Sequence, residues 1–298
     1  MSPKDLCLAL LVIIAWGLNF VVIKYGLDGL PPMLLGCLRF TLVAIPAIFF
    51  IRRPQLPWVW LLAYGATISF GQFAFLFESM AHGMPPGLAS LVLQAQAFFT
   101  LLFAALFIGE RLRVASVLGL LIAAAGLALI GLDTGAATPL VAVLLTLCAA
   151  SMWAMGNIIT RRFGHVDLVA LVVWGAIVPP LPFLGMSLWL EGPALVEHSL
   201  RNIGLSSLLS LAYLAFVATL FGYISWSKLL SRYPTGRVAP FSLLVPVVGL
   251  SSSALLLGER LSALQCAGGL LVMAGLVVNV AGPKLWQRFA GRGRSPAT

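Results

Sequence analysis

Ten long apolar runs, separated by short breaks rich in proline, glycine and arginine, follow one another along almost the whole chain. A helix rises about 1.5 Å per residue, so about 20 residues cross roughly 30 Å of hydrocarbon. The pattern therefore predicts an all-α integral membrane protein with ten transmembrane helices. We place them at residues 5–24, 33–51, 58–79, 87–108, 114–132, 139–159, 168–190, 206–227, 237–257 and 262–282.

The composition supports lipid as the environment, because 61% of the residues are hydrophobic and only 9% are charged, against about 25% charged residues in soluble domains. The net charge of +9 would suggest a nucleic-acid partner in a soluble protein. Membrane proteins, however, collect Lys and Arg in their cytoplasmic segments. Fourteen of the 18 Lys and Arg residues lie on one side of the predicted spans, three lie on the other, and Arg39 lies within a span. We therefore expect no nucleic-acid partner, both termini in the cytoplasm, and a basic cytoplasmic tail at 283–298.

Few other chemical signals interrupt the apolar pattern. The cysteines lie far apart in apolar runs without metal or redox spacing, and no Gly-rich phosphate loop ending in Lys-Ser or Lys-Thr occurs. We expect no metal, no cofactor and no ATP-driven step within this chain. The first apolar run follows Lys4 and has no small-residue cleavage site after it, so we expect an uncleaved first helix rather than a signal peptide.

An internal repeat is the most informative feature of the sequence. Gly109-Glu110-Arg111-Leu112 recurs as Gly258-Glu259-Arg260-Leu261, shifted by 149 residues, and the same shift aligns Gly119 with Gly268. Each half, 1–133 and 139–282, then holds five spans. Because five is odd, the second half enters the membrane from the opposite side, and this inverted arrangement is typical of secondary transporters.

The repeated turns, together with several longer strings, resemble the EamA family of the drug/metabolite transporter superfamily over nearly the whole chain. The strings are WGLNFVVIK at 16–24, LRF at 38–40, GLASLVLQAQAFFT at 87–100, RVAP at 237–240 and LLVPVVG at 243–249. They are most similar to members that export O-acetylserine and cysteine. The resemblance implies export of small amino-acid-type metabolites across a bacterial inner membrane. The coupling ion, the direction and the choice between monomer and homodimer stay open.

Two ionisable residues within the apolar runs are candidates for transport, since such groups are costly in a bilayer. Arg39 either holds a substrate carboxylate, locks helices by pairing with a carbonyl or carboxylate, or reaches the outer surface. Glu78 is either a proton-coupling carboxylate or an acid facing a loop beyond the true end of its span, and we favour the second interpretation.

Buried amides and aromatic residues complete the candidate substrate site. Asn19 and Asn157 occupy related places in the first helices of the two halves, where an amide either binds the ammonium and carboxylate groups of an amino acid or bridges helices. Gln94 and Gln96 differ by two positions, so we expect at most one of them to face a cavity. The remaining candidates are Gln72, Trp16, Trp153, Tyr223 and Trp226, with Tyr213 as a further wall residue.

The repeated turns are expected to be structural, with gating as an open alternative. Glu110 and Glu259 can cap the helix that follows each turn, and Arg111 and Arg260 can meet the C-terminus of the helix before it. A membrane enzyme and a channel are the rival classes, but the sequence contains no His-Glu-x-x-His motif and no sign of a repeated filter.

Overall fold

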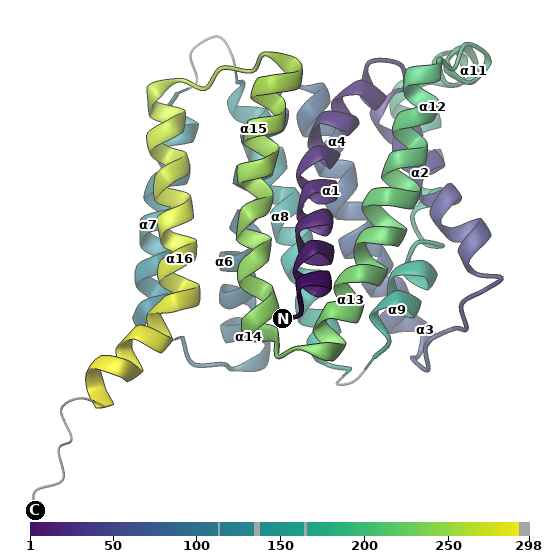
Figure 1. The fold of residues 1–298 in the computed structure, drawn as a ribbon. Helices are drawn as coiled ribbons and strands as arrows, with labels where there is room; N and C mark the ends of the chain where they lie inside the picture. Colours follow the sequence, from purple (N-terminus) through teal and green to yellow (C-terminus); the bar gives the residue numbers. More distant parts are fainter. Residues whose placement is uncertain (113, 134–137, 164–165, 292–298) are drawn as a thin grey trace, which may run out of the picture.

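The computed structural model describes residues 1–112, 114–133, 138–163 and 166–291, and these residues form helices and short connections without a strand. Nine helical segments are long and apolar enough to cross a membrane, and α2 (Pro32–Ala47) is a shorter apolar helix beside them. The prediction of an all-α bundle with ten membrane segments is confirmed. Figure 1 shows them standing side by side, with α1 beginning at the same end of the bundle at which α16 ends. We call this the N-terminal end and the opposite one the far end.

The first half contains five membrane segments, several of them built from α-, π- and 3₁₀-helical pieces. They are α1 (Pro3–Leu27), α2, the run α3 (Trp58–Tyr64), η1 (Gly65–Gly71) and α4 (Gln72–Ala81), the run α5 (Pro86–Val92), η2 (Leu93–Ala95), α6 (Gln96–Phe103) and η3 (Ala104–Ile108), and α7 (Val114–Leu132).

The second half repeats this order with two differences. Its segments are α8 (Leu140–Arg161), the run α9 (Leu168–Gly175), α10 (Pro180–Met186) and η4 (Ser187–Glu191), the run α12 (Leu205–Ala212), η5 (Tyr213–Phe221) and α13 (Gly222–Arg232), the run α14 (Thr235–Val238), η6 (Ala239–Leu244) and α15 (Val245–Leu257), and α16 (Ala263–Gly291). The predicted span 168–190 is interrupted between α9 and α10, where Pro179 and Pro180 lack the N–H groups that would continue a helix. An additional helix, α11 (Pro193–Arg201), follows it. The expected tail at 283–298 is partly helical, since α16 continues to Gly291, and its last residues, 292–298, lie outside the described residues.

Close glycine contacts between α7 and α16 show that the two halves are inverted. A Cβ at Gly119 would come within 2.6 Å of the carbonyl oxygen of Gly275, and one at Gly275 within 2.5 Å of the oxygen of Gly119. Gly126 and Gly268 approach each other in the same way, at 2.5 and 2.6 Å. The shift of 149 residues relates Gly119 to Gly268 and Gly126 to Gly275. Gly119 therefore contacts the counterpart of Gly126, and Gly126 contacts the counterpart of Gly119, as a local two-fold axis between α7 and α16 requires. Small residues permit this approach of two membrane helices.

We expect Gly126→Ala to lower the melting temperature of the detergent-solubilised protein. The added methyl would lie 2.5 Å from the Gly268 carbonyl oxygen and 2.9 Å from the Val272 backbone nitrogen. Both are backbone atoms, which cannot move aside as a side chain can. Overpacking of this kind costs about 1–3 kcal/mol. Gly185→Ala is the matched control, because a Cβ at Gly185 meets nothing within 4 Å. Equal melting temperatures for the two variants would contradict close packing of α7 on α16.

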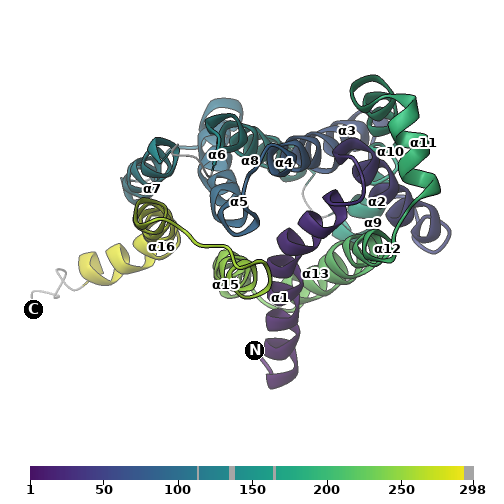
Figure 2. The same ribbon diagram turned by 90° about the horizontal axis from the view of Figure 1, so that it is seen from above.

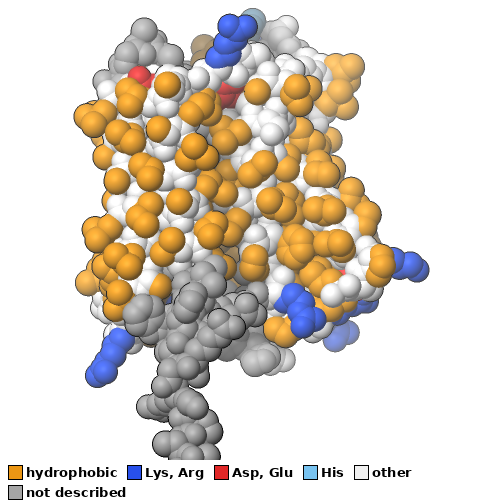
Figure 3. Space-filling model, turned by 60° about the vertical axis from the view of Figure 1, so that its left-hand side comes forward, with side chains coloured by type: hydrophobic (Ala, Val, Ile, Leu, Met, Phe, Trp, Pro, Cys, Tyr) orange, Lys and Arg blue, Asp and Glu red, His pale blue; other side chains and the backbone are white. Residues whose placement is uncertain are grey.

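The helices form two rows, and each row combines parts of both halves. Figure 2 shows α7, α6, α8 and α4 in one row and α16, α15, α1 and α13 in the other. The first helix of each half therefore packs on later helices of the other half, α1 on α15 and α8 on α4 and α6. On the face shown in Figure 3, hydrophobic side chains cover the height of the bundle, while Lys and Arg lie at its two ends. Leu121 of α7 and Leu270 of α16 are exposed apolar side chains, and an apolar surface suits lipid.

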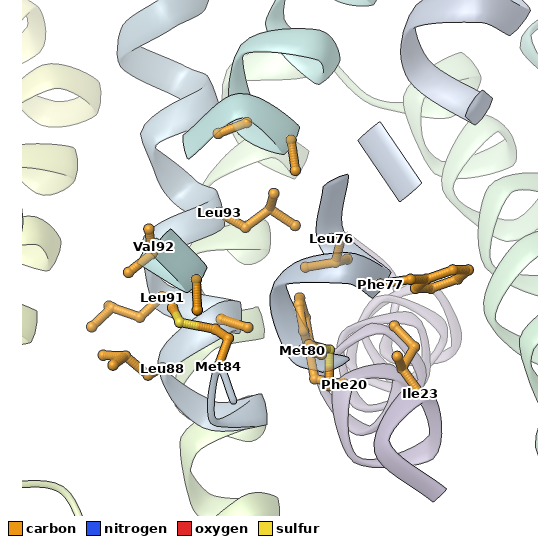
Figure 4. Close-up of a cluster of buried hydrophobic side chains, with 14 of the residues drawn as sticks. Phe20, Ile23, Leu76, Phe77, Met80, Met84, Leu88, Leu91, Val92 and Leu93 are labelled. Atoms are coloured by element: carbon orange, nitrogen blue, oxygen red, sulfur yellow. The ribbon is translucent and has the colours of Figure 1, made fainter. Parts of the chain in front are cut away.

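The far end of the bundle is tightly packed. Figure 4 shows side chains from α1, α4 and α5 that belong to one buried hydrophobic cluster, with Met84 between the last two helices. Ile23, Phe77 and Leu88 are completely buried there. The packing leaves the space for a polar site in the middle of the bundle and toward the N-terminal end.

Candidate substrate cavity

A cavity of about 500 Å³ lies between the two rows of helices. At the N-terminal end it is lined by Thr160 near the end of α8, Leu168 at the start of α9 and Leu230 near the end of α13. Toward the far end its lining stops at Ser90 in α5. The cavity therefore extends from the second turn of α5 to the N-terminal end of the bundle.

All ten side chains expected to bind substrate line this one cavity. They come from both halves and from six different membrane segments: Trp16, Asn19, Arg39, Gln72, Gln94, Gln96, Trp153, Asn157, Tyr223 and Trp226. Their grouping is a structural result, while their contact with substrate stays a prediction. Tyr213 is not among the lining residues, and its hydroxyl donates to the carbonyl of Ala15 at 3.0 Å.

The expectation that Gln94 and Gln96 face different sides was wrong. Both line the cavity because the helix tightens into the 3₁₀ segment η2 between them. Two positions apart on an α-helix, side chains diverge by about 160°, whereas on a 3₁₀-helix they diverge by about 120°. Long amide side chains at that smaller angle reach the same space.

Arg39 is the one cationic side chain among the described lining residues, and it is only 3% exposed. Its Nη2 donates to the hydroxyl of Thr219 at 3.1 Å, and the guanidinium lies 4.1 Å from the ring centre of Phe73. Nε and Nη1 are buried without a hydrogen-bond partner. Arg39 neither reaches the surface nor forms an ion pair with a described carboxylate, so two of its nitrogens remain to donate to another group.

The amides fall into two groups. Asn157 bridges helices, since its Nδ2 donates to Gln96 Oε1 and to Thr100 Oγ1, both at 3.2 Å. The oxygens Asn19 Oδ1 and Gln72 Oε1 are instead buried without a hydrogen-bond partner. Unsatisfied buried polar groups are costly, so these two acceptors are suited to a donor on a bound solute.

Aromatic rings form one wall of the cavity. The ring centre of Trp16 lies 5.5 Å from that of Tyr223 and 5.3 Å from that of Trp226. The indole N–H of Trp16 donates to the carbonyl of Ala218 at 2.9 Å, which holds the ring in place. Tyr64 and Phe73 also line the cavity. They were not predicted, because single aromatic residues in apolar helices carry no distinguishing signal.

Glu78 lies outside the cavity. It is in the last turn of α4 at the far end, its side chain is 25% exposed, and one carboxylate oxygen is 3.4 Å from Nδ1 of His82. This placement favours an acid near the end of its span over one that meets the solute directly.

Among the described residues, neither turn carboxylate caps the helix that follows it, although the sequence allowed this role. Ser262 and Gln265 cap α16 instead: the Gln265 N–H donates to Ser262 Oγ at 3.0 Å and the Ser262 N–H to Gln265 Oε1 at 3.1 Å. Glu259 instead contacts the first half: its carboxylate accepts from the backbone N–H groups of Gly87 at 3.0 Å and Leu88 at 3.4 Å.

Glu110, the repeat counterpart of Glu259, binds a different partner. Both of its oxygens accept from Nη1 of Arg161, at 3.1 and 3.0 Å. Arg111 and Arg260 are exposed, and neither donates to a helix C-terminus within the described part of the chain. Glu191, which sequence analysis also missed, caps α2 through the N–H of Met33 at 2.6 Å.

An inverted pair of five-helix units around a buried polar cavity defines a multi-pass membrane protein of the secondary-transporter class. The model of the EamA-like transporter family matches residues 4–132 and 140–281. The chain belongs to this family.

Relatives of similar length agree with this assignment. The chain is 53% identical to a probable amino-acid metabolite efflux pump of Escherichia coli, covering 97% of this chain and 98% of the relative. It is 26% identical to a probable terminal-alkyne amino-acid exporter of Streptantibioticus cattleyicolor, covering 97% and 95%. One crystal structure is similar with a TM-score of 0.61 and 22% identity, covering 93% of this chain and 96% of that one, which shows the fold alone.

Proposed function

We propose that this protein exports small amino-acid-type metabolites, with O-acetylserine and cysteine as substrates, across the bacterial inner membrane by alternating access. The names of the relatives support the substrate class, and the resemblance noted in the sequence supports the two solutes. Arg39 is the observation that carries the proposal, because a buried guanidinium with two unsatisfied nitrogens needs an anion.

The carboxylate common to amino acids is the partner that Arg39 fits best. A guanidinium donates charge-assisted hydrogen bonds to a carboxylate, and Nε and Nη1 of Arg39 are the nitrogens without a hydrogen-bond partner. Leaving a charge buried and unpaired costs several kcal/mol, so a carboxylate relieves a cost that the empty protein carries.

The far end is closed in this conformation by contacts between the two halves. Glu259 binds the N-terminus of α5, where its negative charge favours the positive end of the helix dipole. The distribution of Lys and Arg supports a cytoplasmic N-terminal end. The cavity is then loaded from the cytoplasm while the outer side is sealed, as export requires.

Exchange of roles between the halves provides the outward-open conformation. The shift of 149 residues relates Leu88 at the start of α5 to Arg237 in α14, and Glu259 to Glu110. In the present conformation the Arg237 N–H donates to Pro234 and Glu110 binds Arg161. When Glu259 releases α5, Glu110 takes the corresponding place at the N-terminus of α14 and seals the N-terminal end.

Counterflow in proteoliposomes tests the function. Vesicles preloaded with unlabelled cysteine or O-acetylserine should accumulate the labelled solute several-fold over protein-free vesicles, since a carrier exchanges bound solutes faster than it leaks them. Flux without counterflow would indicate a channel, and no flux of either solute would discard the substrate assignment.

Repeating the assay with a pH gradient, on the native chain and on Glu78→Gln, tests Glu78 as a coupling acid. If both respond equally to the gradient, Glu78 has no such role.

A further inference from the structure

The cavity carries a fixed positive charge and no fixed negative charge. All nine Asp and Glu residues of the chain fall within the described residues, and none of them lines the cavity. Five form ion pairs with Arg, Lys or His at the ends of the bundle. Three accept from helix N-termini and one from the Ser262 hydroxyl. Arg39 is therefore not balanced by the protein itself.

Because of this imbalance, the cavity favours one charged group of an amino acid over the other. The carboxylate meets Arg39, but the ammonium finds no carboxylate and lies in the same small space as a guanidinium. Taking a charge out of water without a counter-ion is costly, and repulsion between like charges is stronger away from water. The faces of Trp16 and Trp226 attract a cation, but this attraction offsets only part of these two costs.

An uncharged amide in place of the ammonium removes both costs. Its N–H can donate to Asn19 Oδ1 or Gln72 Oε1, the two buried acceptors without a partner. Its acyl group then lies against the apolar and aromatic side chains of the cavity wall. A single N–H donor satisfies one of these acceptors without bringing a second positive charge into the cavity.

We infer that the cavity recognises the carboxylate and not the amine, so that N-acylated amino acids and related small monoanionic carboxylates are substrates alongside free amino acids. Positively charged amino-acid esters, which lack the carboxylate, are excluded. This inference rests on the role given to Arg39 in the proposed function, and it widens the substrate class from zwitterions to monoanions.

Three serine derivatives of similar size and different charge test the inference by binding to the purified protein in detergent. They are N-acetylserine as the anion, O-acetylserine as the zwitterion and serine methyl ester as the cation. We expect N-acetylserine to raise the melting temperature at least as much as O-acetylserine does, and the ester to leave it unchanged. Arg39→Gln should abolish the shifts. Arg201→Gln should keep them, since it removes an exposed arginine of α11 that pairs with Glu197. Arg39→Lys provides a second variant that keeps the charge.

The outcomes separate this inference from the proposed function. Binding of O-acetylserine without binding of N-acetylserine, or binding of the ester, overturns the inference and leaves the proposed export intact. If N-acetylserine binds and shows counterflow while O-acetylserine and cysteine do neither, the substrates proposed above are wrong and the inference stands.

Discussion

Arg39→Gln is expected to reduce counterflow of O-acetylserine and cysteine by roughly 30- to 150-fold. Loss of charged hydrogen bonds to a carboxylate corresponds to about 2–3 kcal/mol, and each 1.4 kcal/mol is about tenfold in affinity. Nε and Nη1 are buried and unpartnered in the empty cavity, so the substitution removes donors that only a solute uses.

A second measurement separates binding from folding. A buried charge without a counter-ion destabilises the empty protein, so Arg39→Gln should melt at the same temperature as the native chain or higher when no solute is present. Arg39→Lys keeps the charge but loses the planar fork, and we expect an intermediate rate. Lower rates together with a strongly lowered melting temperature in both variants would indicate that Arg39 holds the fold rather than the substrate.

Glu259→Gln and Glu110→Gln are expected to shift the conformational equilibrium in opposite directions. Glu259 closes the far end through α5 in the observed conformation, so Glu259→Gln should favour opening of that end. Glu110 takes the corresponding place only in the exchanged conformation, so Glu110→Gln should favour the observed one. Loss of a carboxylate at a helix N-terminus costs about 1–2 kcal/mol, or roughly a tenfold change in the ratio of the two states.

Labelling with a membrane-impermeant thiol reagent measures this shift. A single cysteine introduced as Leu88→Cys, in a chain whose four native cysteines are replaced by serine, reports on the far end because Leu88 is completely buried and lies outside the cavity lining. We expect faster labelling with Glu259→Gln and slower labelling with Glu110→Gln. Faster labelling with both variants would show that the carboxylates stabilise the fold in general and do not exchange roles.

Several features followed from local sequence pattern alone. Apolar runs of about 20 residues require helices that satisfy their own backbone in lipid, so the ten segments and most of their ends were predictable. The repeated Gly-Glu-Arg-Leu turns at an odd helix spacing predicted the inversion that the contacts of Gly119 with Gly275 and of Gly126 with Gly268 display. Polar residues in apolar runs were predicted to cluster because lipid-facing positions exclude them, and all ten candidates line one cavity.

What sequence alone left undecided concerns contacts between distant segments. Helical periodicity gives the face on which a side chain lies, but not the local 3₁₀ tightening at η2 that brings Gln94 and Gln96 to the same side. Likewise, a carboxylate in a turn has several helix ends within reach, and only the packing of the halves selects α5 for Glu259 and Arg161 for Glu110. Hydrophobicity is a property of each segment, whereas the partner of a charge depends on which segments meet. The sequence therefore determined the spans, their inversion and the polar residues held inside, and the tertiary structure decided that Arg39 stands in the cavity without a counter-charge.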